Sequence, residues 1–186
     1  MRVKLQNVRL SFPDLFEAKK FPGQENAAPR YSATFLVEPG GENHKIIEAA
    51  IQSVTTEKFK TKAAALVAGW RTNSNKFCFV DGNTKEYDGY QGMLALASHR
   101  QQSDGRPMVL DANKTPLTIA DGKPYAGCYV NAVVNIYAQV GQYAGVRCEL
   151  LGVQFYRDGD AFTGAGRVSE EDFEDLAVTE SEDALT

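Results

Sequence analysis

This chain of 186 residues has few of the side chains that build metal sites and disulfide frameworks. It contains only two histidines, and its three cysteines, Cys78, Cys128 and Cys148, stand far apart and form no CxxC pair. Zinc sites need clusters of such ligands at short spacings, so we expect no metal centre, and we expect three packed, reduced thiols.

Long apolar runs are also missing. No stretch approaches the roughly 18 apolar residues of a membrane-spanning helix. The N-terminal residues alternate in polarity and lack the continuous apolar stretch of a signal peptide. These absences predict a protein of the host cell cytoplasm that has neither a membrane association nor a cofactor.

Positive charge is absent from the end of the chain. All 20 Lys and Arg residues lie between Arg2 and Arg167, whereas 8 of the 24 Asp and Glu residues follow Ser169. The body therefore carries +4 and the tail −8, which together give the net charge of −4. An acidic chain normally argues against nucleic-acid binding, but here the acid is concentrated in one segment. We divide the chain into a body, residues 1–168, and an acidic tail, residues 169–186.

The apolar pattern of the body predicts a mainly β protein with one substantial helix. Alternation indicates strands over residues 3–12, 30–38, 92–99, 128–140 and 146–157, with shorter ones at 76–80 and 108–110. A change of phase predicts a bulge near Asn7, and proline and glycine predict a loop over residues 14–29. Helical spacing predicts a helix over residues 42–67 that bends after Thr55 and Thr56.

This layout favours one fold class over two others. About five strands with a single inserted helix indicate an OB-fold-type β-barrel, and a β-sandwich is the alternative. The order of elements does not alternate between strand and helix, which excludes a Rossmann-type sheet. The tail is acidic and lacks apolar periodicity, so it is predicted to be disordered, apart from one or two helical turns after Ser169.

Motifs for catalysis are scarce. The glycines near residue 165 lack the spacing of a phosphate-binding loop, and no serine occupies a nucleophile elbow. Asp81, Glu86 and Asp88 could in principle hold the divalent ions of a nuclease, but such residues are common in exposed turns. We therefore expect no catalytic residues and no enzymatic activity.

Aromatic residues in basic or polar surroundings are the more informative pattern. Aromatic rings stack on the bases of single-stranded DNA, and nearby Lys and Arg neutralise its phosphates. On this basis we predict stacking residues among Trp70, Tyr87, Tyr90 and Tyr125, and phosphate contacts from Arg71, Lys76, Arg100, Arg106 and Lys123. A role in the core is the alternative for Trp70. Tyr129 and Tyr137 are predicted to face away from the core of their strand.

The tail interleaves acidic and apolar residues after a glycine-rich linker. A tethered acidic segment can occupy a basic groove at high effective concentration, from which DNA would displace it. We predict that the freed tail binds partner proteins through Glu170, Glu171, Asp172, Phe173, Glu174 and Asp175. A merely solubilising tail is the alternative.

Several segments resemble a family of bacteriophage single-stranded DNA-binding proteins related to the replication proteins of podoviruses. These segments are residues 125–132 (YAGCYVNA), 150–159 (LLGVQFYRDG) and 173–176 (FEDL), together with residues 7–12 and 31–35 near the N-terminus. The resemblance implies an OB fold, binding of single strands without sequence preference, no catalysis, and a tail that recruits replication or recombination proteins. A homodimer also fits this family.

One feature departs from the family pattern. Podoviral relatives end on an aromatic residue, whereas this chain ends on Ala184, Leu185 and Thr186, so Phe173 is the candidate anchor of the tail. Two other functions stay open: a virion protein that assembles through its β surfaces, and the metal-dependent nuclease considered above.

Overall fold

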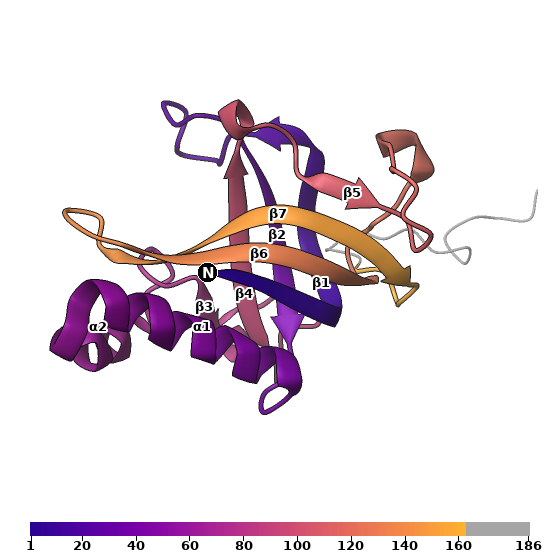
Figure 1. Ribbon diagram of the computed structural model, residues 1–186. Helices are drawn as coiled ribbons and strands as arrows, with labels where there is room; N and C mark the ends of the chain where they lie inside the picture. The colour runs from indigo at the N-terminus through magenta and orange to yellow at the C-terminus, as the bar shows by residue number, and fades with distance from the viewer. Residues whose placement is uncertain (163–186) are drawn as a thin grey trace, which may run out of the picture.

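The computed structural model describes residues 1–162 as a β-barrel closed at one end by helices (Figure 1). The strands are β1 (Arg2–Lys19), β2 (Arg30–Val37), β3 (Phe79–Asp81), β4 (Leu94–Gln101), β5 (Met108–Leu110), β6 (Tyr129–Gln139) and β7 (Gly145–Arg157). The helices are α1 (Glu42–Phe59) and α2 (Ala63–Trp70), joined by the 3-10 turn Lys60–Lys62.

Five of these strands form the barrel. The sheet runs in the order β3-β4-β2-β1-β6-β7-β5, and an additional pairing between β4 and β7 closes it. The neighbours around the barrel are antiparallel except for β4 and β7, which are parallel. The prediction of a mainly β, OB-type barrel with a helix after the second strand is confirmed.

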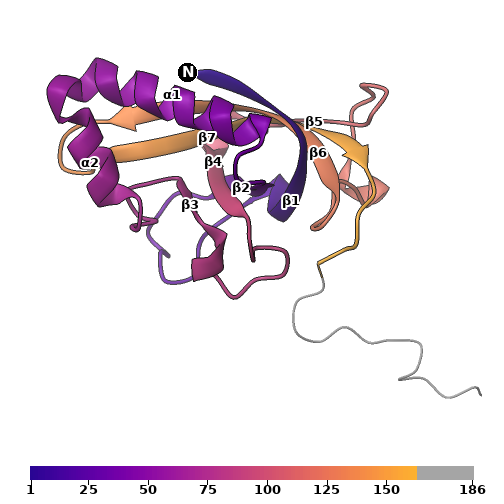
Figure 2. The same ribbon diagram turned by 90° about the horizontal axis from the view of Figure 1, so that it is seen from below.

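Alternation within each strand fills the barrel interior. On β2 and β6 the residues of one face are buried, as the sequence pattern predicts: Tyr31, Ala33, Phe35 and Val37, and then Val130, Ala132, Val134 and Ile136. Helix α1 adds Ile47, Ala50, Ile51 and Val54 to the same core and lies across the open end of the barrel (Figure 2). At about 25 cal/mol per Å² of buried apolar area, this shared core is the main source of stability.

The predicted position of the bend in the helical segment is wrong. Helix α1 continues through Thr55 and Thr56, because the Thr55 hydroxyl donates back to the Ile51 carbonyl at 2.7 Å and so remains satisfied inside the helix. The break instead lies at Lys60, whose φ of 53° ends α1 before α2 starts.

The first strand is longer than predicted. The predicted bulge is present: the register against β6 shifts between Leu5 and Val8, and Asn7 has a φ of 52°. The expected loop over residues 14–29 is wrong in its first part, because β1 pairs with β2 as far as Lys19 through two further register shifts. Pro13 is tolerated there because it lies at one of these irregularities.

The three cysteines are free and buried, as predicted. Burial raises the pKa of Cys78 to about 12 and that of Cys128 to about 11, which keeps both as neutral thiols. Within residues 1–162, no helix is both long enough and apolar enough to cross a membrane. The predicted tail and its helical turns lie outside the described residues.

Candidate nucleic-acid interface

A groove of about 560 Å³ lies on the outside of the barrel where β4 and β7 separate. These strands pair at one position, His99 opposite Glu149. Further along, residues 76–78 fill the gap: the Cys78 carbonyl accepts from Ala97 at 2.9 Å, and the Cys78 amide donates to Val146 at 3.1 Å. The groove therefore follows the seam at which the barrel closes.

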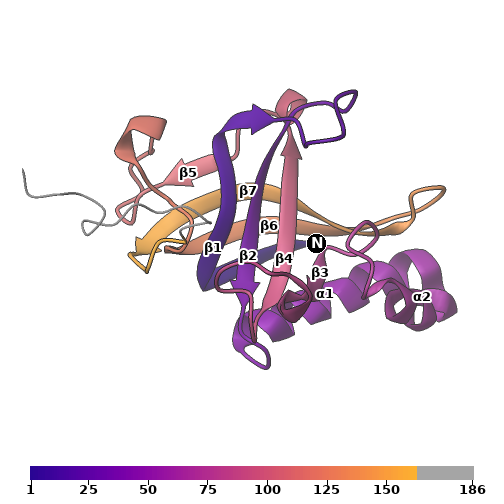
Figure 3. The same ribbon diagram turned by 180° about the vertical axis from the view of Figure 1, so that it is seen from behind.

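Two loops flank this seam. Gln24, from the connection between β1 and β2, lines one side, and the β6–β7 hairpin extends past the barrel on the other (Figures 1 and 3). The OB fold binds oligonucleotides on its second and third barrel strands, between the loop joining strands 1 and 2 and the loop joining strands 4 and 5. In this chain those strands are β2 and β4, so the groove occupies the ligand-binding face of the fold.

Arg147 brings an uncompensated charge to the groove. Its guanidinium donates only to neutral groups: the Gln139 side chain at 3.3 Å, the Tyr143 carbonyl at 3.2 Å and the Asn75 carbonyl. In the part of the chain that the structure describes, Arg147 has no ion pair with a carboxylate. Its charge is therefore available to an anion.

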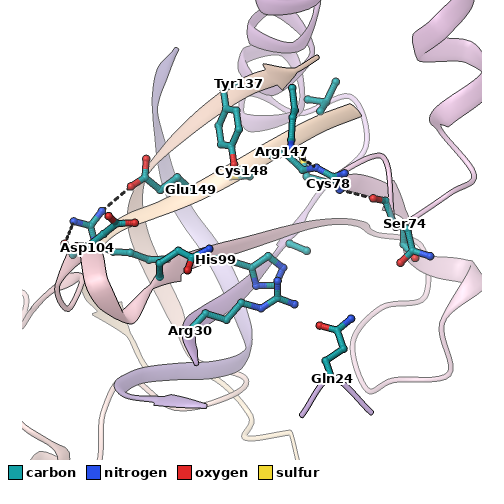
Figure 4. Close-up of a pocket in the computed structure, with 16 residues that line it drawn as sticks. Gln24, Arg30, Ser74, Cys78, His99, Asp104, Tyr137, Arg147, Cys148 and Glu149 are labelled. Carbon is teal, nitrogen blue, oxygen red and sulfur yellow. Dashed lines mark hydrogen bonds and ion pairs between the residues drawn. The ribbon is translucent and has the colours of Figure 1, made fainter. Parts of the chain in front are cut away.

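Arg30 and His99 lie side by side on the floor of the groove (Figure 4). The Arg30 guanidinium lies 3.9 Å from the centre of the Phe21 ring, and the His99 ring meets the same phenyl ring edge-on at 5.7 Å. The buried Nε of Arg30 and Nδ1 of His99 have no hydrogen-bond partner among the described residues. An unsatisfied buried polar atom costs about 1–3 kcal/mol.

The electrostatics of this pair favour an anion. Burial, and after it the nearby charges of Arg30 and Arg147, lower the pKa of His99 to about 4, so the imidazole is neutral at pH 7. Burial also lowers the pKa of Arg30, but a guanidinium stays charged at neutral pH. A phosphate close to these arginines would offset the positive charge that disfavours protonation of His99.

Arg100 has a different role. It forms an ion pair with Glu149 at 2.8 Å and donates to the carbonyls of Gly105 at 2.8 Å and Asp104 at 2.6 Å. These contacts tie β4 to β7 and hold the turn after β4. Arg100 thus shapes the groove. Most of the N–H donors of its guanidinium are already used in these contacts.

Exposed rings stand around these charges. Tyr137, on the outward face of β6, lies over the groove and is 41% exposed (Figure 4). Tyr143, in the β6–β7 turn, is 66% exposed, and Phe21 lies against Arg30. Such rings can stack on bases, and unpaired guanidinium groups can neutralise phosphates.

Among residues 1–162, no cluster of three His, Cys, Asp or Glu side chains could hold a metal ion.

Comparison with known proteins identifies the family of this chain. A family model described as Enterobacter phage Enc34, ssDNA-binding protein, matches residues 1–185. The chain belongs to this family. A putative protein p50 of Acyrthosiphon pisum secondary endosymbiont phage 1 is 46% identical over 188 residues, which cover 100% of this chain and 99% of that protein.

Solved structures support the same family. The single-stranded DNA-binding protein of bacteriophage Enc34 in complex with ssDNA has a TM-score of 0.69 and 25% identity, over 87% of this chain and 89% of that one. The gp2.5 protein of bacteriophage T7, a single-stranded DNA-binding protein, has a TM-score of 0.54 and 14% identity over 92% of each chain, and this likeness shows the fold. The family assignment confirms the sequence resemblance. It favours a binding protein over both the nuclease and the virion protein.

The nine predicted DNA contacts do not meet on one surface. Arg100 lines the groove, and Lys76 follows the groove-lining residues Ser74 and Asn75. Arg106 lies two residues beyond Asp104, which also lines the groove, and its guanidinium is 5.9 Å from the centre of the Phe16 ring.

Two of the predicted stacking rings are buried. Trp70 packs edge-on against Phe59 at 5.5 Å within the core, which is the alternative weighed for it in the sequence. Tyr90 packs on Leu36 and donates its hydroxyl hydrogen bond to Ser11 at 3.1 Å. In this structure neither ring presents a face to the groove.

The other four residues occupy separate positions. Arg71 makes a bidentate pair with Glu48 at 2.7 and 2.8 Å, which joins α2 to α1. Lys123 pairs with Asp111 at 3.1 Å, and Tyr125 donates to Asp158 at 2.7 Å. Tyr87 is exposed, in a second depression described below.

The sequence reasoning missed most of the groove. Phe21, Arg30, His99, Tyr143 and Arg147 were not among the predicted contacts. A partial signal was present, since strand alternation predicts that Arg30 and Tyr137 point away from the core. No sequence spacing shows that barrel closure brings β2, β4, β6 and β7 to one seam.

Proposed function

We propose that this protein binds single-stranded DNA without sequence preference, and that the strand crosses the groove between the β1–β2 connection and the β6–β7 hairpin. The observation that supports this most strongly is the pair Arg30 and Arg147. Neither forms an ion pair within residues 1–162. Arg30 lies against the Phe21 ring, and Arg147 lies opposite Tyr137 across the β6–β7 hairpin.

The chemistry of the groove suits a single strand. Arg30 and Arg147 would contact phosphates and release counterions, while Tyr137, Tyr143 and Phe21 would stack on bases at about 1–3 kcal/mol each. Every base has a ring face, so stacking gives little sequence preference. A duplex hides those faces, which would favour the single strand.

The groove can be tested by anisotropy titration of a fluorescein-labelled oligo-dT over a series of salt concentrations. We expect Arg30→Ala and Arg147→Ala each to weaken binding about tenfold. Each should also reduce the slope of log K against log salt by about 0.7, because one phosphate contact is lost. Lys45→Ala, which removes an exposed charge from α1, is the matched control and should change neither quantity. Full affinity in both groove variants would place the strand elsewhere.

Other predicted residues extend this path. Lys76 and Arg106 follow groove-lining residues and are exposed, so we propose them as contacts at its ends. Lys123 and Tyr125 remain predicted contacts farther along the strand. A homodimer also remains a prediction.

The tail is the second part of the proposal. We propose that residues 169–186, with a charge of −8, compete with DNA for the basic groove and recruit partners through the segment from Glu170 to Asp175. The setting would be phage DNA replication or recombination in the host cytoplasm. In the same titration, a chain ending at Arg167 should bind oligo-dT more tightly, and the gain should shrink as salt rises. Equal affinity at low salt would refute the competition.

A further inference from the structure

A second depression, of about 890 Å³, lies away from the groove and shares no lining residue with it. Its walls come from the irregular part of β1, from the turn before β4, from Ala126 ahead of β6 and from Phe162, which follows β7. The residues that line it include Phe12, Pro13, Asp14, Glu86, Tyr87 and Phe162. We name it the aromatic depression.

Two large aromatic side chains of the aromatic depression are exposed to solvent. Phe12 is 53% exposed and Tyr87 is 50% exposed, and their rings meet edge-on at 4.7 Å. The buried Tyr90 supports both, at 6.4 Å from Phe12 and 5.2 Å from Tyr87. Clustered exposed rings on a rigid support are typical of interaction surfaces.

The backbone at Phe12 is strained. Its φ is 46°, in the left-handed region that residues with a side chain rarely adopt, at a cost of about 1–2 kcal/mol. The β1–β2 register shifts between Ser11 and Asp14, around this residue. Such irregularities turn a side chain out of its strand pattern. Here the result is a phenyl ring that leaves the barrel interior and stays half exposed.

The charge around the rings is negative. Asp14, Glu86 and Asp88 line the depression, and Lys19 is the one cation among the described residues that line it. Lys19 is already paired with Asp14 at 2.7 Å. Such a surface repels the phosphates of DNA and also the acidic residues of the chain's own tail. The negative charge attracts cations, and the faces of the aromatic rings bind cations as well.

We propose that the aromatic depression docks a segment of a partner protein that has an aromatic or aliphatic anchor flanked by Arg or Lys. The anchor would pack on Phe12 and Tyr87, and the flanking cations would face Glu86 and Asp88. This surface is independent of the DNA groove, so the protein could hold a partner while a strand occupies its other face.

The test is a selection from a displayed library of random peptides, with the full chain as the target. Enriched peptides are then measured by anisotropy against Phe12→Ser, Tyr87→Ser and Glu86→Lys. We expect enriched sequences to combine an apolar anchor with Arg or Lys, and each variant to weaken their binding at least about tenfold. Tyr156→Ser is the matched control, since Tyr156 is 51% exposed but does not line the depression. It should bind the peptides as the unaltered chain does.

Three results would overturn the proposal. The first is a failure to enrich any peptide whose binding depends on Phe12 and Tyr87. The second is enrichment of acidic peptides, or displacement of the selected peptides by the segment 169–186, which would assign the depression to the tail. The third is loss of oligo-dT binding in Tyr87→Ser and Glu86→Lys with melting temperatures unchanged, which would assign it to DNA. Glu86→Lys alters only an exposed side chain, so it stays informative even if Phe12→Ser unfolds.

Discussion

His99 is the residue whose environment differs most from what the sequence suggests. In the sequence, His99 lies within a predicted strand and belongs to no motif that indicates a special role. In the fold it lies between Arg30, the Phe21 ring and the β4–β7 seam, with its Nδ1 buried and unpaired among the described residues. Its pKa of about 4 follows from burial first and from the charges of Arg30 and Arg147 second.

This pKa predicts a loss of stability in mild acid. The folded value, about 4, lies below the ordinary value of 6.5, so the unfolded chain takes up a proton first as the pH falls from about 6.5 to 4. We expect His99 to contribute a loss of up to about 2 kcal/mol in the free energy of unfolding between pH 7 and pH 5. Chemical denaturation at the two values should show this loss in the unaltered chain and a smaller one in His99→Gln.

The comparison with His99→Gln separates this effect from the carboxylates. The pair with Arg71 lowers the pKa of Glu48, so its stabilising effect is lost as the pH falls from the ordinary value of 4.5 through the lower folded value, mostly below pH 5. Equal losses in the two proteins between pH 7 and pH 5 would show that His99 is not held in its neutral form.

At the scale of the elements, the start of β7 depends on a close approach that only glycine permits. A Cβ on Gly145 would lie 2.3 Å from the Lys76 carbonyl oxygen, and Val146 accepts and donates across the same junction. This contact holds residues 76–78 in the seam beneath the groove. The absence of a side chain at position 145 is therefore part of how the barrel closes.

Substitution of this glycine should be costly. We expect Gly145→Ala to lower the free energy of unfolding by about 2 kcal/mol or more, because the clash is with the Lys76 backbone, whose carbonyl accepts a hydrogen bond from Val146. Gly69→Ala is the control: nothing lies within 4 Å of a Cβ there, and alanine favours α2 by up to about 1 kcal/mol. Thermal denaturation measures the stability of both variants. Unchanged stability in Gly145→Ala would mean that the backbone at the seam can move apart without a loss of stability.

The elements were predicted better than their ends. Strand alternation and helical spacing identified the barrel strands and the helical segment, because those patterns follow directly from burial on one face. The extension of β1 to Lys19 was missed, since register shifts interrupt the alternation that would reveal it. The bend at Lys60 was misplaced because threonine, a weak helix former, is satisfied here by a hydrogen bond to its own helix.

At the scale of the whole molecule, the fold was predictable and the groove was not. The fold class depends on the number and order of strands, which local patterns reveal. The groove depends on which side chains meet at a seam between strands 50 residues apart, His99 and Glu149. Proximity of basic and aromatic residues in the sequence does not show which of them meet at this seam: Arg71 and Lys123 lie elsewhere in ion pairs with carboxylates, and Trp70 is in the core.

Positive and negative charge are concentrated on different parts of the molecule. The tail concentrates acid, while Arg30 and Arg147 leave uncompensated charge on one face of the barrel and Glu86 and Asp88 make a different face negative. On this account one chain has a face for DNA and a separate face for a cationic partner.

The most direct test of the central claim is photo-cross-linking to an oligonucleotide that contains 5-iodouracil, followed by identification of the cross-linked residues by mass spectrometry. Iodouracil couples to aromatic side chains that stack on it. We expect cross-links at Tyr137, Tyr143 or Phe21, and their loss when unlabelled oligo-dT competes. Cross-links confined to Tyr87, Tyr125 or Tyr156, with none at the groove, would contradict the proposed path of the strand.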